Sequence, residues 1–139
     1  MSEYLLKALV AIALLGAGLT SFLTMMALMG KTGERTNAAK LRRLHKWSGF
    51  AYLALLVPLV YLGAGFLSDL GEGLSVRAVF HFVLAALLLA VVVLKFLVVR
   101  TYRQFLKYAL GLGMTVVVLT VVIFLITAGY FFLRGAALE

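Results

Sequence analysis

Four long runs of apolar residues, separated by short polar segments, dominate the chain. They span about residues 4–29, 44–68, 76–100 and 104–133. An α-helix needs roughly 20 apolar residues to cross a hydrocarbon core about 30 Å thick, and each run is long enough for one crossing. The pattern therefore predicts an all-α integral membrane protein, a four-helix bundle that forms a single domain over residues 1–139.

Lysine and arginine are concentrated in two of the predicted connections. The basic residues between the first and second helices are Lys31, Arg35, Lys40, Arg42, Arg43 and Lys46. Those between the third and fourth helices are Arg100, Arg103 and Lys107. The opposite side of the membrane has only Lys7, Arg77 and Arg134. Cytoplasmic connections retain positive charge during membrane insertion. We therefore expect both basic connections in the cytoplasm and both termini outside, in a prokaryotic cytoplasmic membrane.

Composition narrows the chemistry that such a protein can perform. Hydrophobic residues make up 65% of the 139 positions, which leaves no room for a soluble catalytic domain beside the four spans. Cysteine is absent, so thiolate catalysis, iron–sulfur clusters and cysteine-ligated zinc are excluded. The net charge of +8 reflects membrane topology, and we expect no nucleic-acid partner. No Asp or Glu falls inside a span, which argues against a proton-coupled exporter.

The ionisable residues within the spans are the candidates for function, because a charge at membrane depth is costly. They are His45 at the inner start of the second helix, His81 one turn inside the outer start of the third, and Lys95. At about 100° per residue, Gly49 and Gly63 fall on the His45 side of the second helix. The same side also carries Ser48, Tyr52, Leu56 and Leu59. The small residues leave flat space at two depths, as a haem ring packing on a helix requires.

The two histidines cannot ligate one iron within a single chain. The helical rise places His45 and His81 roughly 25 Å apart across the membrane. A homodimer with its twofold axis along the membrane normal would bring each histidine to its own mate, and would hold one b-type haem near each face. Arg42, Arg43 and Lys95 would then be available to the propionates of the inner haem, and Arg77 to those of the outer, by charge-assisted hydrogen bonds.

Two short stretches carry a family resemblance. The sequence HKWSGFAYLA at 45–54 and the sequence RAVFHFVLA at 77–85 resemble the paired haem-ligand helices of the cytochrome b561 superfamily. That resemblance implies a four-helix core with four histidines on two b-type haems, of which this chain has half. The HKWSG stretch is also similar to the His-Arg-x-x-Gly opening of succinate dehydrogenase anchor subunits, which lies near quinone and haem.

We therefore expect a membrane cytochrome with haem b that transfers electrons within or across the bilayer, between a quinone pool and a redox partner protein. One alternative is a haem-free subunit that anchors or stabilises a larger membrane complex. Another is a quinone-binding subunit without haem, in which His45, Ser48 and Tyr52 bind quinone by hydrogen bonds. Two roles without a ligand also remain as alternatives. His45 would be an ordinary histidine at the membrane interface, and Lys95 would extend toward the inner surface near Arg100.

Overall fold

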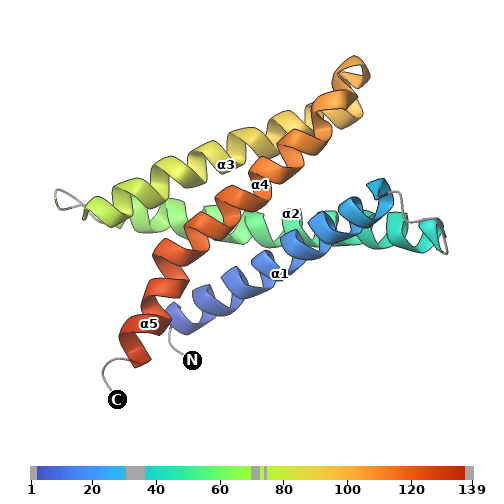
Figure 1. Cartoon of the computed structure of the whole chain (residues 1–139). Coiled ribbons are helices and arrows are strands. Elements are labelled where there is room, and N and C mark those ends of the chain that lie inside the picture. Colours follow the sequence, from blue (N-terminus) through green and yellow to red (C-terminus); the bar gives the residue numbers. More distant parts are fainter. Residues whose placement is uncertain (1–2, 31–36, 70–72, 74, 137–139) are drawn as a thin grey trace. The chain divides into compact units, whose positions relative to one another are not determined.

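The computed structural model describes residues 3–30, 37–69, 73 and 75–136, and these residues are almost entirely helical (Figure 1). The elements are α1 (Glu3–Met29), α2 (Ala38–Asp69), α3 (Val76–Arg100), a 3₁₀-helix η1 (Arg103–Tyr108), α4 (Ala109–Phe124), a π-helix η2 (Leu125–Gly129) and α5 (Tyr130–Ala136). The turns predicted after the first and second runs lie largely outside the described residues.

The prediction of an all-α protein with four long apolar helices is confirmed. The segments long and apolar enough to cross a membrane are Leu5–Met29, Ala38–Gly65, Val76–Arg100 and Arg103–Arg134. The third run has the predicted bounds, whereas α2 begins at Ala38, before the predicted start near Leu44. That extension is rich in basic residues and could not be found by hydropathy. The helix continues through Pro58.

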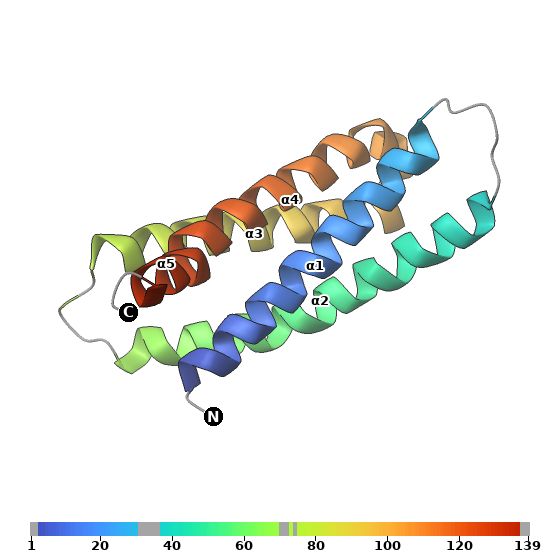
Figure 2. The same ribbon diagram turned by 60° about the horizontal axis from the view of Figure 1, so that its bottom comes forward.

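The chain divides into two compact units, residues 1–67 and 68–139. In the first unit, α1 and α2 run side by side (Figure 2). Tyr52 of α2 is buried and packs on Gly18 of α1, where two of its ring carbons lie 3.2 and 3.3 Å from the position that a Cβ would take. A glycine at this position therefore lets the tyrosine ring approach the backbone of α1.

In the second unit, α3 packs against α4 and also contacts η1 and η2. The Oγ of Ser75 caps the start of α3 by accepting a hydrogen bond from the Ala78 N–H at 3.2 Å. At the other end, the Thr101 N–H donates to the Leu97 carbonyl at 2.8 Å. A two-residue turn then leads into η1, close to the tight connection predicted at 101–103.

A π-helical turn interrupts the fourth apolar run. In η2 the Tyr130 N–H reaches back five residues to the Leu125 carbonyl. The Oγ1 of Thr127 donates to the Ile123 carbonyl at 2.7 Å, so a side chain supplies a hydrogen bond at this irregular turn. The hydropathy pattern does not predict this segment, because all of its residues are compatible with a membrane helix.

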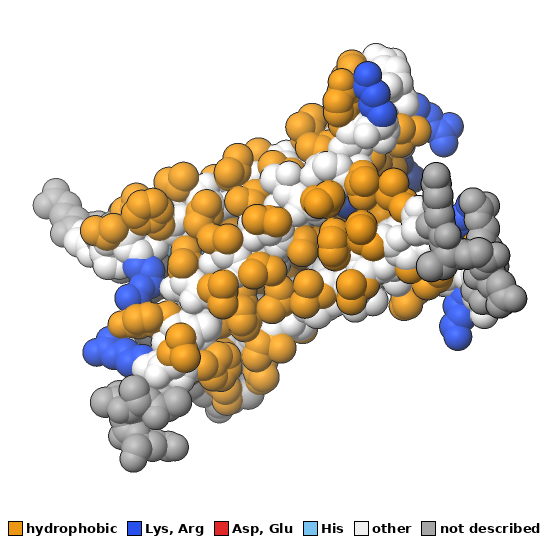
Figure 3. Space-filling view, viewed as in Figure 1, with side chains coloured by type: hydrophobic (Ala, Val, Ile, Leu, Met, Phe, Trp, Pro, Cys, Tyr) orange, Lys and Arg blue, Asp and Glu red, His pale blue; other side chains and the backbone are white. Residues whose placement is uncertain are grey.

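Large hydrophobic side chains cover the surface of the helices. On the face in Figure 3 they extend along the helices, and lysine and arginine side chains occur near helix ends. Tyr61, Leu133 and Val57 are 79%, 74% and 70% exposed. A soluble protein rarely exposes so much apolar surface to water, so the lipid bilayer is the partner of this surface.

Candidate functional site

His45 is held by hydrogen bonds from its α2 position to the backbone of α1. Its Nδ1 lies 2.8 Å from the carbonyl oxygen of Ser21, and the hydroxyls of Ser21 and Thr24 lie 3.2 and 3.5 Å from the same nitrogen. A carbonyl can only accept, so Nδ1 carries the proton and donates it to Ser21. For the other ring nitrogen, Nε2, the described residues supply no hydrogen-bond partner.

Two hydroxyl groups near His45, those of Thr24 and Ser48, donate to backbone carbonyls. Thr24 is buried, and its hydroxyl donates to the Thr20 and Ser21 carbonyls at 2.8 and 3.0 Å. Ser48, also buried, donates to the His45 carbonyl at 3.1 Å. Sequence reasoning missed the α1 residues of this cluster. Polar residues at 20, 21 and 24, spaced within one turn inside an apolar run, were the available signal.

The predicted haem side of α2 is partly used for packing. Tyr52 packs on α1 as described, and Ser48 and Leu56 of the same stripe are buried. At Gly49 and Gly63, in contrast, no described atom lies within 4 Å of the position of an added Cβ. These two glycines are therefore uncovered, whereas the residues between them are largely covered, and the predicted haem surface stays a prediction.

His81 has a different environment in α3 of the second unit. Its ring is half-buried and meets Phe82 edge to face, with 6.1 Å between ring centroids. The Nδ1 atom is buried and has no hydrogen-bond partner among the described residues. Because His45 and His81 belong to different units, their predicted separation stays a prediction. Within the described chain, no three His, Asp or Glu side chains come together as a metal site.

Lys95 crosses from α3 to α4. Its Nζ lies 3.2 Å, and its Cε 3.7 Å, from the position that a Cβ would take on Gly113. The side chain is half-buried, and no anionic group of the described residues meets it. Arg42 and Arg43, also predicted at the inner haem, are exposed.

Arg77, predicted at the outer haem, has an aromatic partner instead. Its guanidinium carbon lies 3.4 Å above the centroid of the Tyr130 ring. The sequence offered no signal for this pair, because the π-helical turn before Tyr130 determines which way that residue faces.

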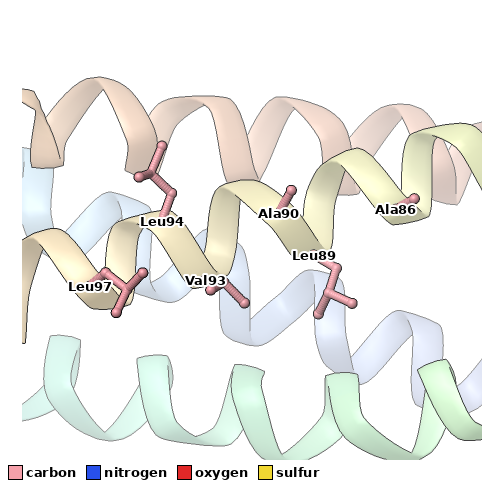
Figure 4. A pocket seen from close by; sticks show the side chains of 6 residues that line it. All are labelled: Ala86, Leu89, Ala90, Val93, Leu94 and Leu97. Atoms are coloured by element: carbon pink, nitrogen blue, oxygen red, sulfur yellow. The ribbon is translucent and has the colours of Figure 1, made fainter.

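A hollow of about 500 Å³ runs along α3. The described residues that line it are Ala86, Leu89, Ala90, Val93, Leu94 and Leu97, all from α3 (Figure 4). Its lining is aliphatic and offers no side chain for catalysis or for metal binding.

Four apolar helices of membrane-spanning length, with an all-α fold, define an integral membrane protein. The chain belongs to the DUF6529 family, described as a family of unknown function, whose model matches residues 1–139. No curated protein matches the chain, and no solved structure does. These comparisons provide no link to the cytochrome b561 superfamily, so that resemblance rests on the two stretches at 45–54 and 77–85 alone.

Proposed function

We propose that the protein is a membrane b-type cytochrome in which Nε2 of His45 is an iron ligand. The observation that carries this proposal is the 2.8 Å hydrogen bond from His45 Nδ1 to the Ser21 carbonyl. Histidines that bind metals commonly donate their other ring N–H to a backbone carbonyl, which fixes the ring and makes the ligating nitrogen more basic. His45 is prepared in this way before any metal binds.

The surroundings of His45 suit a flat, anionic ligand. Gly49, the residue four positions further along α2, leaves open space beside the histidine. Arg42 is exposed three residues before it, on the same side of the helix, and is available to a propionate. The described chain offers no second histidine to the same site in this unit, so we infer that a second copy supplies the mate of His45 in a homodimer. His81 would pair with its own mate in the same dimer, although its Nδ1 lacks the orienting hydrogen bond that His45 has.

Bound haem would supply reversible one-electron transfer, and the protein's contribution is to hold and tune it. We infer that both termini lie outside and that the basic connections lie in the cytoplasm, as their lysines and arginines favour. The His45 haem would then be near the cytoplasmic face and the His81 haem near the outer face. Electrons would pass between a quinol pool and a redox partner protein.

The hydrogen bond of His45 also weighs against direct binding of a quinone. A quinone carbonyl accepts hydrogen bonds and needs a donor. With its proton committed to Ser21, a neutral His45 presents only a lone pair on Nε2, which suits a metal ion or the hydroxyl of a quinol. A quinone carbonyl would require the charged imidazolium at this position.

The decisive experiment is spectroscopic. The protein would be expressed with adequate haem supply and purified, and its pyridine-haemochrome and reduced-minus-oxidised spectra would be recorded with the oligomeric mass. We expect b-type absorption and two haems per dimer. His45→Ala and His81→Ala should each remove one haem per dimer, whereas Lys46→Ala, an exposed neighbour, should keep both.

A colourless wild-type protein would refute the proposal. If such a protein remained intact only with other chains, it would be a haem-free anchor or stabilising subunit. If it were colourless but lost quinone reductase activity on His45→Ala, the quinone-binding alternative would hold.

A further inference from the structure

A second polar feature lies at the end of the second unit where α3 begins, one helical turn from His81. It includes Arg77, the residue also predicted at the outer haem. Here a hollow of about 450 Å³ opens between α3 and the η2–α5 segment. Its lining residues are Val76, Arg77, Phe80, Leu125, Ile126, Tyr130 and Leu133. The walls are therefore apolar, apart from the Arg77 guanidinium and the Tyr130 phenol, which lie side by side at the rim.

Arg77 interacts with the Tyr130 hydroxyl, and it keeps further N–H donors because a guanidinium carries five. A separation of 3.4 Å between the guanidinium carbon and the Tyr130 ring centroid is the thickness of two stacked planar groups. The guanidinium is therefore stacked face to face with the ring. Its N–H groups point outward in its own plane, where they can bind two oxygens of a phosphate at once.

A second arginine reinforces the positive charge of this rim. Arg134 follows Tyr130 by four residues on α5, and residues at this spacing are neighbours on a helix surface. Its side chain is exposed and also interacts with Tyr130. Two cations therefore flank one phenol beside an apolar hollow.

We propose that this hollow binds an anionic glycerophospholipid. The phosphate lies between Arg77 and Arg134, and an acyl chain occupies the hollow along Phe80, Leu125 and Leu133. A lipid matches both halves of the site, because it joins a phosphate to a hydrocarbon chain. An anionic headgroup is favoured over a zwitterionic one, since a headgroup cation would be repelled by the two guanidinium groups.

The π-helical turn strengthens this assignment. Leu125 and Ile126 of the lining belong to η2, and Tyr130 directly follows it. A π-helical turn inserts one residue into a helix, and such turns occur frequently at functional sites. Without the extra residue Tyr130 would be rotated by about 100° around the helix axis, and its ring would not lie under Arg77.

The site can be tested by photolabelling in nanodiscs of phosphatidylcholine. A trace of phosphatidylglycerol with a diazirine in its acyl chain would be compared with the same diazirine chain on phosphatidylcholine. Labelled residues would then be mapped by peptide mass spectrometry. We expect labelling within 125–133 to be at least fivefold higher with the phosphatidylglycerol probe.

Matched variants separate this site from general surface charge. Compared with the wild type, Arg77→Gln should reduce the phosphatidylglycerol labelling at 125–133 at least fivefold. Arg77→Lys should keep part of that labelling, less than the wild type and more than Arg77→Gln. Arg103→Gln, an exposed arginine of η1, should leave it unchanged. Equal labelling by the two probes in the wild-type protein would overturn the proposal without any variant. Full labelling in a folded Arg77→Gln protein would overturn it as well.

Discussion

The contact between Gly18 and Tyr52 makes a quantitative prediction about the α1–α2 unit. A Cβ on Gly18 would lie 3.2 and 3.3 Å from two carbons of the Tyr52 ring. Ordinary carbon–carbon contacts are about 3.5–4.0 Å. Tyr52 is only 5% exposed, so its rigid ring has little room to withdraw. Such overpacking costs about 1–3 kcal/mol.

Gly16 provides the matched control, because no described atom lies within 4 Å of its added Cβ. Both Gly→Ala substitutions gain the same helix propensity, about 0.8–1.0 kcal/mol, which cancels in the comparison. We expect Gly18→Ala to be about 1–3 kcal/mol less stable than Gly16→Ala. Steric trapping of unfolding in bicelles measures this difference directly. If the two variants were equally stable, α1 and α2 would not be in the close contact at Gly18 described above.

Three further substitutions test individual interactions. Ser75→Ala should destabilise the start of α3 by about 0.5–2 kcal/mol, seen as faster hydrogen exchange of the Ala78 N–H. Lys95→Met should be at least as stable as the wild type in haem-free protein, because no described anion compensates the half-buried charge; a clear loss in steric trapping would reveal a hidden partner. Thr127→Val should cost about 1 kcal/mol or less in the same assay, since it removes the hydrogen bond to the Ile123 carbonyl at 2.7 Å and a longer one to the Phe124 carbonyl at 3.4 Å. A larger loss would contradict this.

Hydropathy alone located the four long helices, because a membrane span requires only sufficient apolar length. The third run, Val76–Arg100, has the predicted bounds at both ends. The beginning of α2 was missed because basic residues interrupt Ala38–Arg43, and a helix can continue beyond the apolar region. The 3₁₀ and π segments were also missed, since both depend on local hydrogen bonding that composition does not reveal.

The candidate site could be predicted only one helix at a time. Spacing along α2 found His45 and the open space at Gly49, but the carbonyl of Ser21 that orients the ring lies on another helix and is a backbone group. Helical phase also could not distinguish a surface of α2 that binds a haem ring from one that packs on α1. Tyr52 lies on this surface and packs on α1. Arg77 was found as a cation, whereas its partner Tyr130 depends on the π-helical register.

The extra residue of η2 has an evolutionary consequence. Deleting one residue from Leu125–Gly129 would restore an uninterrupted α-helix, and it would turn everything after it through about 100°. A single-codon deletion could thus remove the Arg77–Tyr130 stack while leaving the hydropathy profile of the protein unchanged. Family members should therefore either keep both the insertion and the aromatic–arginine pair or lack both together.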